Sequence, residues 1–246
     1  MSKSTIKRAL SSLGWSVRRV PSGVVVGHDL PRDLAIVMGP RPDPACIDVG
    51  ANVGDFVELL KTTLREPRIH AFEPAPEPFA RLKERYGRDP RVWLNNAGLG
   101  AGDGQLNFNI YDNQTLNSAL PISEAGTGTL GGPKLLRTTQ VPVLALDGYA
   151  DSRGIERIDL LKIDTQGFEL QVLRGSEHLL AARRVSVVLL ELNFVPLYEG
   201  QVAGHEVMAF LSERGFGLVD FYEKCRLNPF VGWCTALFAL RPLESK

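Results

Sequence analysis

The chain has 246 residues, of which 44% are hydrophobic and 23% charged, an ordinary composition for a globular protein with a sizeable core. Lysine plus arginine equals aspartate plus glutamate at 28 each, so net charge does not indicate a nucleic-acid or polyanion partner. The three cysteines match no disulfide framework or zinc spacing, and no apolar run reaches the roughly 18 residues of a membrane span. A cytoplasmic location is expected.

The N-terminal part is expected to be an extension over residues 1–44 that packs on the core. Residues 1–20 mix basic side chains with apolar ones, as in a short amphipathic helix. Packing against the domain is favoured over the alternative, attachment to a membrane surface. A small strand is expected at 24–26, and residues 32–44, rich in proline and charge, lead into the core.

The first unit of the core is a buried strand at 45–49, a turn that contains Gly50 and Gly54, and a helix over 54–64. The two glycines permit a tight turn and a close approach of the backbone. A strand at 68–73 follows and ends in Glu73, about 20 residues beyond the turn, where a carboxylate accepts from ribose hydroxyls. The pattern predicts a nucleoside site at the carboxyl ends of these strands.

Further alternation predicts a parallel sheet with helices on both faces. A helix is expected at 77–86 and a strand at 91–96. Apolar residues alternate with asparagines over 106–110, which predicts one strand of an inserted β-hairpin. Residues 123–134 are expected to form a mobile surface loop, and 141–146 another strand.

The C-terminal half continues the alternation. A strand at 158–164 ends in Asp164, and a helix begins at Phe168 after Gly167. The nearly unbroken apolar run at 185–191 is typical of a central parallel strand. A helix is expected at 203–214, and the strands at 217–222 and 233–240 follow without a helix between them, so they should pair as an antiparallel hairpin.

Four segments together resemble the FkbM family of class I S-adenosyl-L-methionine-dependent methyltransferases: 48–54, 72–74, 160–169 and 173–175. The resemblance covers about residues 45–240 and is most specific in 160–169, which reads LLKIDTQGFE. It implies a methyltransferase domain over 45–246 with an α/β, Rossmann-like fold. That fold has a seven-stranded, mostly parallel sheet whose last strand is antiparallel. It also implies O-methylation of sugars or secondary metabolites in natural-product biosynthesis.

The cofactor side of the site follows from the glycine turn. Asn52 stands where a dinucleotide turn has its middle glycine, and S-adenosylmethionine has no pyrophosphate that needs this space. Backbone amides at 50–52 are expected to face the amino-acid tail, and Asp48 either accepts from its ammonium or organises the turn. The full set of expected cofactor-binding residues is Asp48, Gly50, Asn52, Gly54, Glu73, Asn96 and Ala97.

On the acceptor side, a hydroxyl is a poor nucleophile and needs a base or a metal to assist its deprotonation. Asp164 is the predicted base, with Lys162 on the same face of the strand to hold it ionised. Alternatively, Lys162 and Asp164 form a structural ion pair that shapes the floor of the site. His205 is a reserve base. A Mg²⁺ ion between Asp164 and either Glu191 or Asn193 is the other route.

Two functions from other classes remain open at this point: a nicotinamide-dependent oxidoreductase and a non-catalytic nucleoside-binding domain. Asn52 in the glycine turn and the segment Lys162–Glu169 argue against the first. The expected partner is a small-molecule acceptor, with no nucleic acid and no membrane span, and formation of a homo-oligomer stays open.

Overall fold

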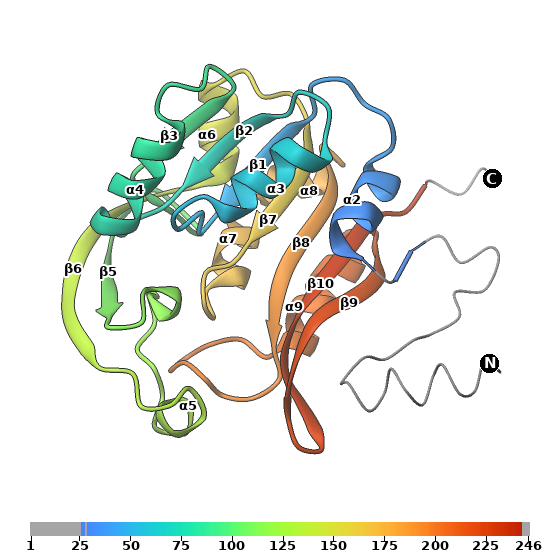
Figure 1. Cartoon of the computed structure of the whole chain (residues 1–246). Coiled ribbons are helices and arrows are strands. Elements are labelled where there is room, and N and C mark those ends of the chain that lie inside the picture. Colours follow the sequence, from blue (N-terminus) through green and yellow to red (C-terminus); the bar gives the residue numbers. More distant parts are fainter. Residues whose placement is uncertain (1–25, 28, 243–246) are drawn as a thin grey trace, which may run out of the picture.

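The computed structural model describes residues 26–27 and 29–242. The helix predicted over 1–20 therefore lies outside the described residues, as does the strand predicted at 24–26 apart from Val26, which forms a bend. The main sheet has seven strands in the order β3-β2-β1-β7-β8-β10-β9, and β10 runs antiparallel to both of its neighbours. The predicted sheet with an antiparallel last strand is confirmed (Figure 1).

The strands of this sheet alternate with helices along the chain, as the sequence predicted. The strands are β1 (Ala45–Val49), β2 (Arg68–Phe72), β3 (Val92–Asn95), β7 (Ile158–Ile163), β8 (Val185–Asn193), β9 (Phe216–Leu227) and β10 (Phe230–Leu240). The helices are α2 (Leu30–Met38), α3 (Asp55–Thr63), α4 (Pro76–Tyr86), α5 (Glu124–Thr129), α6 (Leu146–Ser152), α7 (Glu169–Arg174), α8 (Glu177–Ala181) and α9 (Gly204–Glu213).

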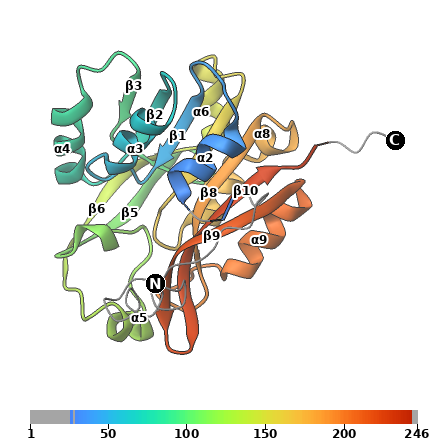
Figure 2. The same ribbon diagram turned by 45° about the vertical axis from the view of Figure 1, so that its right-hand side comes forward.

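A hydrophobic core lies on each face of the main sheet. On one face, side chains of β1, β7 and β8 pack against α2, α3 and α4. On the other face, the alternate side chains of the same strands pack against α6, α7, α8 and α9. Figures 1 and 2 show α2 and α3 together on one side of the sheet and α9 on the other. Within the described residues no helix is long and apolar enough to cross a membrane.

A second sheet is inserted after β3. It has three strands in the order β4-β6-β5, namely β4 (Gly98–Leu99), β5 (Gly104–Tyr111) and β6 (Leu135–Leu144). β5 and β6 pair antiparallel, as predicted for the inserted hairpin, and the 3-10 helix η1 (Gln114–Leu116) lies between them in sequence. The expected alternation holds for Phe108 and Ile110, but Asn109 is buried too, because it bonds to Ser118 and Thr138.

The connection expected over 32–44 is partly wrong, because residues 30–38 form helix α2. Asp29 caps it by accepting from the backbone N–H of Arg32 at 3.0 Å, and Pro31 stands in the first turn, where its missing N–H is no loss. Leu34 is fully buried in the core beside α3. These capping signals were present in the sequence.

Two expectations about residues 123–146 need correction as well. The expected loop at 123–134 contains helix α5, which Ser123 caps through the N–H of Gly126 at 2.9 Å. The strand expected at 141–146 is the end of the longer β6, and Leu146 belongs to α6 instead. Polar threonines and an exposed apolar pair at Leu135 and Leu136 obscured the start of β6.

The turn after β1 gives a stability test. Gly50 has a φ of +76°, and a Cβ there would lie 1.9 Å from the carbonyl oxygen of Asp164. Gly39 has a similar φ of +70°, but a Cβ there meets nothing within 4 Å. Gly39→Ala should lower the free energy of unfolding by about 1–3 kcal/mol, the cost of the backbone conformation alone, because φ +70° with ψ 175° is a region that other residues rarely adopt. Gly50→Ala should cost about 1–3 kcal/mol more, because β7 must move.

Urea denaturation of both variants measures this difference. Equal losses at the two positions would show that β1 and β7 do not approach as closely as described.

Candidate functional site

The carboxyl ends of the parallel strands form one row of residues. The register pairs Phe72 with Val49, Val49 with Ile163, and Ile163 with Leu190. One residue further along each strand, Glu73, Gly50, Asp164 and Glu191 therefore stand side by side. The row continues to Thr235, which pairs with Glu191 across β10. The fold thus places three carboxyl groups at the edge where open α/β sheets bind ligands.

The glycine turn holds its own backbone amides. The N–H groups of Gly50 and Ala51 donate to the carbonyl of Phe72 at 3.0 and 2.9 Å, and that of Asn52 donates to Glu73 Oε2 at 2.8 Å. The expectation that these amides face a ligand carboxylate is therefore wrong. The turn uses them to join β1 to β2. Asn52 takes a left-handed φ of +48° to make this bond.

Glu73 is buried at this edge, with 5% of its surface exposed. Its Oε1 accepts from the N–H of Ala75 at 2.8 Å, and its Oε2 accepts from Asn52. Burial raises the pKa of Glu73 to about 7, although the two amides act in the opposite direction. Each oxygen retains capacity for a second hydrogen bond, so the carboxylate can accept from two further hydroxyls.

Lys162 connects the ends of β1 and β7. Its Nζ donates to the carbonyls of Gly50 and Val49 at 2.9 and 3.3 Å, and it lies 3.0 Å from Asp48 Oδ1 and 3.7 Å from Asp164 Oδ2. Burial by itself lowers the pKa of Lys162, but the nearby carboxylates raise it overall, so the ammonium stays charged. Asp48 has no exposed surface and lies beneath the turn.

The segment after β7 is a tight turn fixed by Glu169. Its Oε1 accepts from the N–H groups of Thr165 and Gly167 at 3.0 and 3.2 Å and from the Thr165 hydroxyl at 3.1 Å. Gln166 has a φ of +55°, and it donates from Nε2 to Asp164 Oδ1 at 2.7 Å while accepting from the Tyr198 hydroxyl at 2.9 Å. The turn thereby orients the Asp164 carboxylate.

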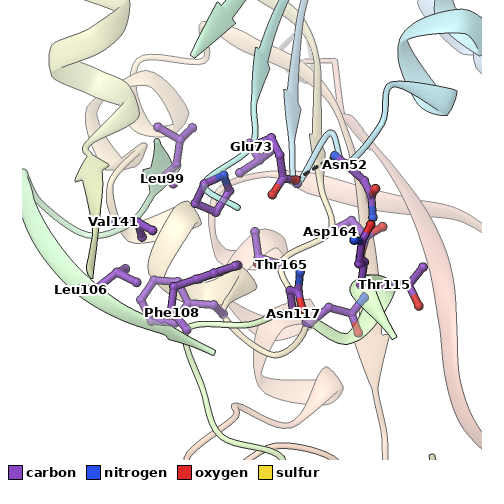
Figure 3. A pocket seen from close by; sticks show the side chains of 18 residues that line it. Asn52, Glu73, Leu99, Leu106, Phe108, Thr115, Asn117, Val141, Asp164 and Thr165 are labelled. Atoms are coloured by element: carbon purple, nitrogen blue, oxygen red, sulfur yellow. Dashed lines mark hydrogen bonds between the residues drawn. The ribbon is translucent and has the colours of Figure 1, made fainter. Parts of the chain in front are cut away.

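A pocket lies over the turn between the two sheets (Figure 3). Figure 3 shows Glu73, Asn52 and Asp164 on one side of it and the apolar Leu106, Phe108 and Val141 on the other. The remaining lining residues are Val49, Gly50, Pro74, Gly98, Leu99, Gln114, Thr115, Asn117, Ala119, Thr165, Gln166 and Phe168. One polar end and one apolar end suit a ribose joined to an aromatic base.

A second cavity of about 670 Å³ continues from this nucleoside pocket toward β8 and β10. The two share Gly50, Asn52, Gln114, Thr115 and Asp164 in their walls. The second cavity has Lys162, Asp164 and Glu191 on the sheet side, and Phe56 and Leu59 of α3 opposite. Glu223 and Thr235 extend its wall along the β9–β10 hairpin. We call it the acceptor cavity.

The predicted site residues divide into three groups. Gly50, Asn52, Glu73 and Asp164 line the nucleoside pocket, and Lys162 lines the acceptor cavity. Asp48 and Gly54 lie in neither. A Cβ on Gly54 would be 2.5 Å from Tyr86 and 2.7 Å from Leu82, so this glycine serves the packing of α3 on α4.

The chain lines the pocket two residues beyond the segment predicted to read the adenine. Asn96 and Ala97 do not line the pocket, whereas Gly98 and Leu99 do. The Asn96 amide is used to donate to the carbonyls of Glu73 and Pro74 at 2.9 and 3.3 Å. His205 is exposed on α9 and lines neither cavity, so the structure does not bring it to the carboxylates.

Sequence reasoning missed the apolar wall of the nucleoside pocket and the role of Glu169. The alternation of Leu106 and Phe108 was noticed, but nothing in it indicated which surface the strand faces. The described residues contain no group of three or more His, Cys, Asp or Glu side chains that could hold a metal ion, so the Mg²⁺ route gains no support.

The fold, the row of carboxylates and the nucleoside pocket fit an S-adenosylmethionine-dependent methyltransferase. A family model described as the methyltransferase FkbM domain matches residues 48–218. The chain belongs to this FkbM methyltransferase family, as its sequence resemblance indicated. This assignment removes the nicotinamide-dependent oxidoreductase from consideration.

Individual relatives agree with the family. The 2-O-methyltransferase NoeI of Sinorhizobium fredii is 26% identical over 218 residues, which cover 84% of this chain and 85% of NoeI. The 31-O-demethyl-FK506 methyltransferase FkbM of Streptomyces tacrolimicus is 31% identical over 202 residues, covering 73% and 75%. Among solved structures, a methyltransferase FkbM from Methylobacillus flagellatus has a TM-score of 0.49 at 13% identity, over 87% of this chain and 56% of that one.

Glu169 gives a test in which stability depends on pH. Burial raises its pKa to about 7 from an ordinary value of 4.5, against the opposing effect of the backbone amides that it accepts from. The native state therefore holds this proton more tightly, and its contribution to stability is full below pH 4.5 and lost as pH rises through 7. Relative to Glu169→Gln, the wild-type free energy of unfolding should fall by up to about 3 kcal/mol across this window.

Urea titrations at pH 5 and pH 8 measure the effect. Glu169→Ala removes the acceptor for the turn and should be less stable than Glu169→Gln at both pH values. A constant difference between wild type and Glu169→Gln would contradict the raised pKa.

Proposed function

We propose that this enzyme transfers a methyl group from S-adenosylmethionine to a hydroxyl of a sugar or a secondary metabolite. The observation that carries this proposal is the junction of the two cavities at Gly50 and Asp164. A nucleoside held on one side presents its reacting end to an acceptor held on the other. The names of the relatives support oxygen as the target, since NoeI is a 2-O-methyltransferase and another relative acts on 31-O-demethyl-FK506.

The residues present fit the nucleoside half of the cofactor. Glu73 would accept from the ribose hydroxyls, because each of its oxygens accepts only one backbone amide. Leu99, Phe108 and Phe168 would enclose the adenine at the apolar end of the pocket. Asn52 and Asp164 lie where the pocket opens toward the acceptor cavity.

The sulfonium of the cofactor supplies a methyl group that is already activated for transfer. The contribution of the chain is therefore placement, which alone can be worth several orders of magnitude in rate. Asp164 stands at the junction with its carboxylate oriented by Gln166, and we assign it to the acceptor hydroxyl. Lys162 fixes the floor beneath both ligands through the carbonyls of Val49 and Gly50.

A direct test is binding and transfer with the purified chain. S-adenosylhomocysteine should copurify or bind by calorimetry. Adding S-adenosylmethionine with a panel of methyl glycosides and hydroxylated secondary metabolites should then give a product in which one methyl group has replaced a hydroxyl hydrogen, detected by mass spectrometry. Binding without transfer to any acceptor would favour the non-catalytic nucleoside-binding domain.

Glu73→Ala should weaken S-adenosylhomocysteine binding by about tenfold or more, because it removes charge-assisted hydrogen bonds to the ribose. Glu77→Ala is the matched control, since Glu77 is an exposed residue of α4 that pairs with Arg137 away from the pocket. Calorimetry measures both affinities. Unchanged affinity in Glu73→Ala would remove Glu73 from the cofactor site.

Asp164→Asn should leave S-adenosylhomocysteine affinity within about threefold of wild type but lower kcat, because the change affects the hydroxyl of the acceptor more than the nucleoside. The assay uses an acceptor identified in the panel above. If kcat survives, Asp164 has no direct part in the transfer and serves the turn and its ion pair with Lys162.

A further inference from the structure

We propose that Glu191, at the end of β8, is the general base that takes the proton from the acceptor hydroxyl. This inference rests on the proposed function and adds a catalytic residue to it. Asp164 then orients the hydroxyl, and the two carboxyl groups act on the same oxygen from neighbouring strands.

The first argument is position. The register pairs Ile163 with Leu190, so Asp164 and Glu191 stand level at the carboxyl edge of the sheet. Glu191 also pairs with Thr235 of β10, so it is flanked on both sides by residues that line the acceptor cavity. Lys162, Asp164 and Glu191 all line this cavity, whereas Glu73 lines only the nucleoside pocket. Glu191 is therefore on the acceptor side of the junction.

The second argument is availability. Asp164 already accepts from Gln166 at 2.7 Å and lies 3.7 Å from the Lys162 ammonium. Within the described part of the chain, Glu191 makes no ion pair, and its one hydrogen bond is a long one of 3.4 Å from the Asn193 amide. A carboxylate without strong partners is free to accept a proton from a ligand.

The third argument is charge. Burial and the facing carboxyls of Asp164 and Glu169 raise the pKa of Glu191 well above its usual value, while the Asn193 amide and Lys162 act in the opposite direction. Glu223 of β9 adds another carboxyl to the same cavity, and Thr235 of β10 adds a neutral hydroxyl. A carboxylate whose pKa is raised is a stronger base, so it drives proton transfer better than an ordinary carboxylate.

The step balances in atoms and charge. The hydroxyl proton moves to a Glu191 oxygen, the acceptor oxygen bonds to the methyl carbon, and the methyl–sulfur bond breaks with its electron pair remaining on sulfur. A negative carboxylate and a positive sulfonium become a neutral carboxylic acid and a neutral thioether. Because charged groups are costly in a site partly screened from water, the neutralisation of these two charges favours the transfer.

Sinefungin tests the inference without any acceptor. This analogue carries a protonated amine in place of the transferred methyl group, whereas S-adenosylhomocysteine carries nothing there. If Glu191 faces the methyl position, wild-type protein should bind sinefungin at least about tenfold more tightly than S-adenosylhomocysteine at pH 7. Calorimetry at pH 7 measures both affinities.

The variants decide which carboxyl is responsible. Glu191→Gln should lose the preference for sinefungin, with unchanged affinity for S-adenosylhomocysteine as evidence that it folds. Glu191→Asp, which retains a carboxylate, should keep part of the preference. Glu77→Gln, a matched change at an exposed residue of α4 that lines neither cavity, should behave as wild type.

Three results would overturn the inference. A preference that persists in Glu191→Gln shows that Glu191 does not face the methyl position. A preference lost only in Asp164→Asn assigns that position to Asp164. Failure of wild-type protein to bind either ligand contradicts the proposed cofactor site itself, and the inference with it, so the two failures are distinguishable.

Discussion

The site depends on one buried ammonium group. Lys162 holds the ends of β1 and β7 together by donating to the carbonyls of Gly50 and Val49 and by pairing with Asp48 beneath the turn. A charge in the interior is tolerated only when such partners are present, and loss of any of them leaves an uncompensated group. The same lysine lies 3.7 Å from Asp164, so it fixes both the glycine turn and the position of the Asp164 carboxylate.

The strand register carries this local order across the sheet. Glu73, Asp164 and Glu191 are far apart in sequence, but parallel pairing sets them in one row with Gly50 between the first two. A slip of one residue in any strand would turn its carboxyl to the opposite face. The fully buried strands β1 and β7 resist such a slip, because their side chains pack in the cores on both faces.

Much of this could be predicted from the sequence, and the limits have physical causes. Strand ends that stop at a carboxylate located Glu73 and Asp164, since strand direction and periodicity are local properties. The expectation that the amides at 50–52 face a ligand carboxylate was wrong, because their acceptors are the Phe72 carbonyl at the end of β2 and the carboxylate of Glu73, the next residue. The apolar wall was invisible for the same reason, since the side chains of β5 meet the pocket only after the second sheet has folded against the first.

The second sheet supplies the apolar wall of the nucleoside pocket, whereas the main sheet aligns the carboxylates, so the two can vary independently. Beside the pocket, Ser118, between β5 and β6 in sequence, donates a hydrogen bond to the Gln166 carbonyl of the turn after β7 at 2.7 Å. The ladder of the main sheet does not pass through Leu106 or Phe108. Substitutions at Leu106 or Phe108 can therefore change how fast S-adenosylhomocysteine leaves the pocket, and hence the turnover rate. The alignment of Glu73, Asp164 and Glu191 would be unchanged.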